Sequence, residues 1–230
     1  MSHKCQNCSN AGKHPFCSLG DEARSFLESQ SVGVEYPRGT VLFREGDQCD
    51  AIFVVCSGKI KVSVTSREGR TMIFRIAHGG DVLGMSAALG GEPFEVTAEA
   101  LEPSRVRVLH LKPLEHLLHD FAGASMCAAK ALAEDYKIAF DDARRLALPE
   151  TPAGRLARLL LDWAEEAQSD TSTPTITMAL THEELASMTA TTRETVTRTL
   201  GRFRKKKLIA IRGVALTLLQ PSALEQLSAC

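Results

Sequence analysis

Glycine-centred turns recur throughout residues 34–111, and their spacing restricts the fold more than any other feature of the sequence. Turns at Gly39, Gly58 and Gly80 are separated by short apolar runs such as Ala51–Val55. Glycine accepts the positive φ that tight corners require. Turn signals at intervals of about 7 to 12 residues indicate an all-β sandwich or barrel.

The hydrophobic period becomes helical after Pro113. An apolar seam, spaced by alternate steps of three and four residues, is formed by Met126, Ala129, Ala133, Tyr136, Phe140 and Ala143. This spacing is the heptad pattern of helices that pack along one another. We call these six residues the dimer seam, because the pattern favours a dimerisation helix. The same stripe would also suit a helix that packs on its own barrel.

Proline residues mark the end of this helical stretch. Pro149 and Pro152 flank a short break, which indicates a domain boundary. A helix is expected over residues 152–167, and a polar loop over residues 168–175. A short amphipathic helix is also expected near the N-terminus, over residues 18–30.

Two helix starts follow one another closely in the C-terminal region. Thr181 and Thr191 each precede a glutamate by three residues, which is the capping-box spacing. The second helix would place Val196, Leu200 and Phe203 on one face, at the i, i+4 and i+7 positions of a core stripe. Two short helices joined by a tight turn form a helix-turn-helix pattern.

The face opposite this core stripe carries polar and charged side chains near the start of the second helix. In helix-turn-helix proteins these positions meet base edges in the major groove. Arginine can bond guanine O6 and N7 together, and glutamate can accept from cytosine N4. The predicted base-reading residues are therefore Arg193, Glu194, Thr197 and Arg198.

The distribution of charge supports DNA as the partner. The chain has 27 basic and 28 acidic residues, and a net charge of -1 would by itself argue against a nucleic-acid binder. Residues 193–212, however, contain eight basic residues and one acidic residue, so this segment carries +7 and the rest of the chain -8. A phosphate backbone would meet the local patch rather than the average. Phosphate contacts are expected from Thr181, Thr192, Arg202, Lys205, Lys206, Lys207 and Arg212.

With these features in place, the chain resembles the Crp/Fnr family of bacterial transcription regulators. The resemblance rests on RETVTR at residues 193–198 and LGRFRKKKLI at residues 200–209, after a glycine-punctuated β-domain and a long helix. Residues 208–218 then suit a two-stranded wing. The resemblance implies an α+β chain with a jelly-roll β-barrel of the cyclic-nucleotide-binding kind, a long dimerisation helix and a winged helix-turn-helix.

The resemblance also implies a domain layout and partners. We expect a cysteine-containing arm over residues 1–20, a β-barrel sensor domain over 21–112, a dimerisation helix over 113–148 and a winged helix-turn-helix over 149–230. The protein would act as a homodimer on a palindromic operator, with double-stranded DNA and RNA polymerase as partners. Arg193 resembles the Crp branch and Thr197 with Arg198 the Fnr branch, so a TGTGA-like or TTGAT-like half-site is expected.

The resemblance does not extend to cyclic-nucleotide chemistry. Family members that bind cAMP use a glutamate on the ribose and an arginine on the cyclic phosphate. Here Met85 stands at the glutamate position, and Phe94 or Glu95 stands at the arginine position. Neither residue can balance a phosphate charge, so cAMP is not expected as a ligand.

Three of the seven cysteines gather near the N-terminus: Cys5, Cys8 and Cys17. They resemble the Fnr-branch ligands of a [4Fe-4S] cluster, although Arg107 stands where the fourth cysteine would be. Adding His14 gives a ligand set that suits zinc instead. A thiol switch and an arm without any ligand are further alternatives. The signal is therefore either oxygen or redox state, sensed through these cysteines, or a small ligand bound without metal.

Other classes of protein are excluded by what the sequence lacks. No apolar run approaches the ~20 residues of a membrane span, and no signal-peptide core is found at the N-terminus, so a cytoplasmic protein without a membrane partner is expected. Residues 34–111 hold only two histidines, His78 and His110, without cupin spacing. Because hydrolase, protease and phosphate-loop motifs are also absent, we do not expect an enzyme.

Overall fold

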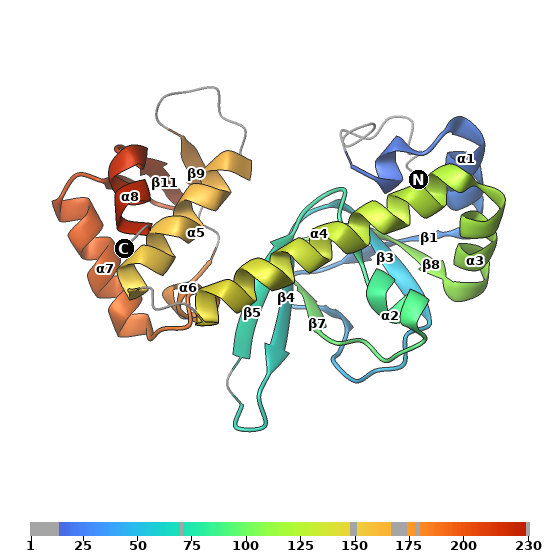
Figure 1. The fold of residues 1–230 in the computed structure, drawn as a ribbon, viewed down its shortest axis with the longest axis horizontal. Helices are drawn as coiled ribbons and strands as arrows, with labels where there is room; N and C mark the ends of the chain where they lie inside the picture. Colours follow the sequence, from blue (N-terminus) through green and yellow to red (C-terminus); the bar gives the residue numbers. More distant parts are fainter. Residues whose placement is uncertain (1–13, 70, 148–150, 167–173, 178–179, 229–230) are drawn as a thin grey trace. The chain divides into compact units, whose positions relative to one another are not determined.

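The computed structural model describes residues 14–69, 71–147, 151–166, 174–177 and 180–228 (Figure 1). The chain divides into two compact units, residues 1–140 and 141–230. The division falls within the long helix, after Phe140. Each unit is described separately below.

The first unit is a β-sandwich with helices at both ends of its sequence. Its elements are η2 (Phe16–Ser18), α1 (Asp21–Gln30), β1 (Val32–Tyr36), β2 (Val41–Phe43), β3 (Ala51–Ser57), β4 (Ile60–Thr65), β5 (Thr71–Ala77), β6 (Val82–Leu83), α2 (Met85–Gly90), β7 (Thr97–Ala100), β8 (Ser104–His110), α3 (Leu111–Asp120) and α4 (Ala122–Ala147). The strands form two four-stranded antiparallel sheets, in the orders β1-β8-β3-β6 and β2-β7-β4-β5. The predicted glycine-punctuated β-domain is confirmed.

Turn glycines and an aromatic cluster define this sandwich. Gly58, between β3 and β4, has a φ of +94°, and a Cβ there would lie 2.2 Å from the Ser104 hydroxyl oxygen. In the interior, the Phe43 and Phe94 rings stack with centroids 4.0 Å apart, and Phe53 packs beside both. All three rings are buried.

The helical stretch expected over residues 113–148 consists of two helices. Helix α3 begins at Leu111, so Pro113 lies in its first turn, where a backbone N–H is not required. The helix ends at Phe121, which is extended (φ -123°, ψ 99°) and whose ring packs on Phe26 of α1, with centroids 5.7 Å apart. Helix α4 starts afresh at Ala122.

The second unit contains α5 (Pro152–Glu166), β9 (Thr175–Thr177), α6 (His182–Met188), α7 (Arg193–Lys205), β10 (Ile209–Arg212), β11 (Ala215–Leu218) and α8 (Pro221–Ser228). Its sheet has the order β10-β11-β9. The two wing strands are confirmed, but the third strand, β9, was not predicted, and its first residue, Thr175, is the last residue of the expected polar loop. Among the described helices of both units, none is long and apolar enough to cross a membrane.

Candidate nucleic-acid interface

The first helix of the helix-turn-helix starts with the capping box that the sequence predicts. The Thr181 hydroxyl oxygen accepts from the Glu184 backbone N–H at 3.2 Å, and the Glu184 carboxylate accepts from the Thr181 backbone N–H at 2.8 Å. Leu185 and Ala186 on this helix are buried. The cap therefore fixes where α6 begins and which face it buries.

The second helix starts one residue later than predicted. The N-cap of α7 is Thr192, whose hydroxyl oxygen accepts from the Thr195 backbone N–H at 3.3 Å. The Thr191 backbone N–H, which a capping box would donate to Glu194, bonds the Ala186 carbonyl at 3.0 Å. The predicted second capping box is therefore wrong. Glu194 is held instead by its own backbone N–H and the Thr192 hydroxyl, which lower the pKa of its carboxyl.

The turn between α6 and α7 is held by Arg155 of α5, which was not among the predicted site residues. Ala190 has a φ of +46°, which is unusual for a residue other than glycine. Arg155 of α5 donates from Nε to the Thr189 carbonyl at 2.7 Å and from Nη2 to the Ala190 carbonyl at 3.2 Å. A cation at the carbonyl end of α6 complements the helix dipole, so Arg155 fixes the position of α6 relative to α7.

The exposed face of α7 holds the predicted base-reading residues together. Val196, Leu200 and Phe203 are buried as predicted, joined by Thr199. On the opposite face, the exposed residues at the N-terminal end of the helix are Arg193, Glu194, Thr197 and Arg198. A helix start with exposed polar side chains is the part that enters a major groove.

The predicted phosphate-contacting residues are also exposed. They lie at the starts of α6 and α7 (Thr181 and Thr192), along and beyond the end of α7 (Arg202, Lys205, Lys206 and Lys207) and at the wing turn (Arg212). Helix starts offer free backbone N–H groups to phosphate. The Thr181 and Thr192 hydroxyl oxygens accept as helix caps, and the Thr181 backbone N–H is already donated to the Glu184 carboxylate.

One contact between the two helices was not anticipated from the sequence. His182, the first residue of α6, places its Nδ1 2.8 Å from the Thr197 hydroxyl oxygen. The Thr197 hydroxyl itself donates to the Arg193 carbonyl at 2.9 Å. A predicted base reader is therefore tied to the neighbouring helix.

The candidate metal ligands are only partly within the described residues. Cys5 and Cys8 lie outside them, whereas Cys17 is half-buried in η2 and His14 is half-buried as well. Within the described ranges, no group of three or more His, Cys, Asp or Glu side chains could hold a metal ion. Arg107, at the position of the Fnr-branch cysteine, is buried and bonds the Ser31 hydroxyl at 3.1 Å.

Residues 14–19, on either side of Cys17, pack against the rest of the first unit. Phe16 and Leu19 are buried in the core cluster that also contains α4 residues. The Cys127 thiol of α4 donates to the Pro15 carbonyl, with Sγ and O 2.8 Å apart, and burial raises the pKa of this thiol. The His14 ring covers Gly80, where a Cβ would come within 2.1 Å of the imidazole. The arm therefore contacts both α4 and the β5–β6 turn.

Three residues stand at the positions where the sequence resemblance would place cyclic-nucleotide contacts, and none of them is a cation: Met85, Phe94 and Glu95. Met85 is buried at the start of α2. Phe94 is buried in the aromatic cluster with Phe43. Glu95 is exposed, and its carboxylate accepts from the Ser86 hydroxyl at 2.8 Å. A phosphate placed against these residues would find an apolar or an acidic neighbour.

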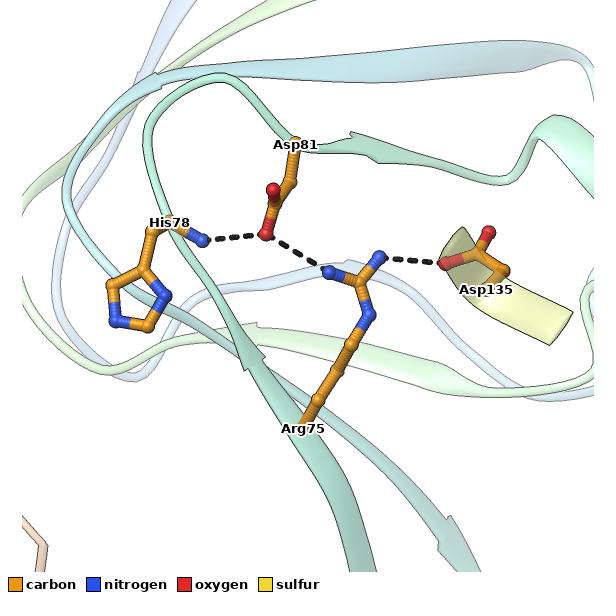
Figure 2. A network of polar contacts seen from close by, with 4 residues as sticks. All are labelled: Arg75, His78, Asp81 and Asp135. Carbon is orange, nitrogen blue, oxygen red and sulfur yellow. Dashed lines mark hydrogen bonds and ion pairs between the residues drawn. The ribbon is translucent and has the colours of Figure 1, made fainter. Parts of the chain in front are cut away.

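A charged network ties the sandwich to α4 (Figure 2). Arg75 of β5 donates from Nη1 to the Asp81 carboxylate and from Nη2 to the Asp135 carboxylate, each at 2.9 Å. Asp81, in the β5–β6 turn, also accepts from the His78 backbone N–H at 2.9 Å. Burial raises the pKa of Asp135, and Arg75 opposes that rise. Burial lowers the pKa of His78.

The dimer seam lies on the solvent side of α4. Met126, Tyr136 and Phe140 are 59%, 72% and 51% exposed, and Ala129 and Ala133 are exposed as well. The Tyr136 and Phe140 rings stack with centroids 6.2 Å apart. The side chain of the sixth seam residue, Ala143, lies outside the described part. The alternative of a stripe packed on the chain's own barrel does not fit, because the buried face of α4 carries Ala124, Ala128 and Ala131.

Comparison with known families gives matches in both units. A family described as "Crp-like helix-turn-helix domain" matches residues 154–227, and one described as "Cyclic nucleotide-binding domain" matches residues 33–121. These ranges contain the exposed face of α7 and most of the β-sandwich, respectively.

Individual relatives and a solved structure agree with these matches. The chain is 26% identical over 199 residues to a CRP-like cAMP-activated global transcriptional regulator of Mycobacterium tuberculosis, covering 86% of this chain and 88% of that protein. It is also 26% identical over 192 residues to the fumarate and nitrate reduction regulatory protein of Escherichia coli, covering 83% of this chain and 76% of that protein. The structure of FixK2 from Bradyrhizobium japonicum superposes with a TM-score of 0.78 at 19% identity, over 87% of this chain and 98% of that one. Equal identity to the first two leaves the branch unresolved.

The charged network yields a prediction on stability. Replacing Arg75 by Gln leaves two partly buried carboxylates without their cation, and we expect the free energy of opening of the first unit to fall by about 1–3 kcal/mol. Arg105→Gln is the matched control, because its pair with Glu35 is largely exposed and should contribute about 0–1 kcal/mol. Hydrogen exchange followed by mass spectrometry measures the opening of each unit separately.

The pH dependence of this variant follows from Asp135. Its folded pKa already lies above the usual value, and loss of Arg75 raises it further. A carboxyl of this kind contributes stability below its unfolded pKa and loses that stability as the pH rises through the folded pKa. The deficit of Arg75→Gln should therefore shrink as the pH is lowered from about 7 towards about 4. A deficit that does not change with pH, or one equal to that of Arg105→Gln, would contradict this role.

Proposed function

Because the chain belongs to the Crp/Fnr family of transcription regulators, we propose that it binds a palindromic operator as a homodimer, with the start of α7 in the major groove. The family consists of DNA-binding regulators that bind DNA as dimers, and not of enzymes. The proposed partners are double-stranded DNA, a second copy of the chain and RNA polymerase, which places the activity in the cytoplasm.

The observation that carries the proposal is the coincidence of two properties on α7. Its exposed N-terminal face presents Arg193, Glu194 and Arg198, whose groups match the hydrogen-bonding edges of bases. The same helix, its C-terminal end and the wing turn carry the basic residues of the +7 segment. Base readers and phosphate contacts therefore belong to one small unit.

The exposed dimer seam supports the homodimer. Burial of large exposed apolar side chains at heptad spacing is most favourable when a second helix covers them. The small residues Ala129 and Ala133 between Met126 and Tyr136 allow two helices to approach closely. Pairing along α4 would set two recognition helices at a spacing of about one DNA turn, roughly 34 Å.

We propose that the signal acts through α4. A change at the arm reaches α4 through Pro15 and Cys127, and a change in the sandwich reaches it through Arg75 and Asp135. A ligand shifts such an equilibrium only by its different affinity for the two states. The candidates are oxygen or redox state, through a [4Fe-4S] cluster or zinc held by Cys5, Cys8 and Cys17 with or without His14, and alternatively a small ligand other than cAMP.

Replacement of Arg198 by Ala tests base readout. We expect a loss of about 1–3 kcal/mol on the operator and relaxed preference at one base pair, because one base contact is removed. Lys206→Ala is the control for phosphate contact, and it should weaken binding to every sequence and reduce the salt slope by about 1. Fluorescence anisotropy at several salt concentrations measures both effects. Unchanged operator binding by Arg198→Ala would show that the wrong face of α7 was assigned.

The signal is tested by two measurements on the whole protein. Calorimetric titration with cAMP should show no binding, because the phosphate would meet Phe94 or Glu95, and micromolar affinity would refute this. Iron, sulfide and zinc content after anaerobic preparation separates the remaining candidates. Iron with sulfide supports the cluster, zinc supports the local site, and protein without metal supports a thiol switch or a small ligand.

A further inference from the structure

The strongest unassigned contact in the DNA-binding unit joins His182 to Thr197. The His182 Nδ1 lies 2.8 Å from the Thr197 hydroxyl oxygen, which lies 2.9 Å from the Arg193 carbonyl oxygen. Thr197 is exposed on the face of α7 that carries the proposed base readers, and His182 is half-buried at the start of α6. The two contacts thus involve one hydroxyl and three residues of the interface.

The number of protons on this hydroxyl determines the direction of both bonds. A threonine hydroxyl has one proton to donate, and the Arg193 carbonyl can only accept. With the Thr197 proton directed to Arg193, the contact with His182 is a hydrogen bond in the tautomer that carries its proton on Nδ1. In this arrangement the Thr197 hydroxyl has no proton left for a base acceptor such as guanine O6 or N7 or thymine O4.

We propose that His182 is a positioning residue that makes Thr197 read DNA through its methyl group rather than through a hydroxyl proton. The base edge with a matching apolar group is the C5-methyl of thymine. The inference rests on the proposed function, because it takes the start of α7 to lie in the major groove. It adds a specificity determinant from α6, the helix that does not itself carry the base readers.

A phosphate contact is the alternative role for His182. Its Nδ1 already contacts the Thr197 hydroxyl, so such a contact would use Nε2. A phosphate contact through Nε2 would change affinity for all sequences equally. A positioning role would instead change the preference at one base pair, and this difference is what the experiment measures.

The test compares two amide substitutions in the full-length protein. The side-chain nitrogen of Asn lies near the position of histidine Nδ1, whereas that of Gln reaches towards Nε2. His182→Asn should keep the base preference of the wild type in selection from random DNA duplexes. His182→Gln and His182→Ala should reduce the preference for thymine at the base pair that Thr197 contacts. The expected reduction is on the order of fivefold, which is the change in affinity that burial of one methyl group provides.

Substitutions of Thr197 complete the test. Thr197→Val keeps the methyl group and removes the hydroxyl, so it should retain the thymine preference. Thr197→Ser removes the methyl group and should lose that preference. In the Thr197→Val background, His182→Ala should have no further effect on base preference, because the group that it positions is absent.

The outcomes separate this inference from the proposed function. Arg198→Ala is measured in parallel: if it relaxes specificity while His182→Ala leaves the base preference unchanged, the role of His182 is refuted and the assignment of α7 stands. If His182→Ala weakens all sequences equally, His182 contacts phosphate and the inference is wrong. If Arg198→Ala also has no effect, α7 is not the base-reading helix, and both the proposed function and this inference are refuted. Circular dichroism of each variant checks that the helices remain folded.

Discussion

Helix α4 carries two apolar stripes, and the core of its own unit covers one of them. The covered stripe consists of small residues, Ala124, Ala128 and Ala131, packed in the cluster that includes Phe16 and Leu19. The other stripe places Tyr136, with its neighbours in the dimer seam, in solvent. Burial of apolar surface is the main favourable term in association, so a second copy of the helix is the partner that this pattern fits. In the proposed dimer, the spacing of the two recognition helices depends on the geometry of this α4 pairing.

The contacts that could change the geometry of this pairing are made by α4 itself. Near its start, Cys127 donates to the Pro15 carbonyl, two residues before Cys17, and further along Asp135 accepts from Arg75. His14 covers Gly80 in the turn that also contains Asp81. A small change at the arm or at the turn therefore acts on α4 directly, and interfaces of packed helices tend to respond by switching between discrete arrangements.

The sequence predicts features whose causes are local. Turn glycines predict the sandwich, heptad spacing predicts the exposed seam, and apolar spacing predicts the buried face of α7. What it misses depends on contacts that the local residue pattern does not show. Thr191 has the spacing of a capping box, but its backbone N–H bonds the Ala186 carbonyl, and Phe121 interrupts the helix where its ring meets Phe26. Arg75 and Asp135 are 60 positions apart, so no local pattern pairs them. The alternation of polar and apolar residues at Thr175–Thr177 was a local signal from which β9 could have been predicted.

The pairing of α4 is tested most directly by sedimentation velocity on Tyr136→Glu, with Lys137→Glu as the matched control. Both positions are exposed on α4, so neither substitution disturbs the core, but only Tyr136 lies in the dimer seam. The account predicts that wild type and Lys137→Glu sediment as dimers and bind a palindromic duplex, whereas Tyr136→Glu sediments as a monomer and binds that duplex no better than a half-site. A Tyr136→Glu protein that remains dimeric would contradict the account.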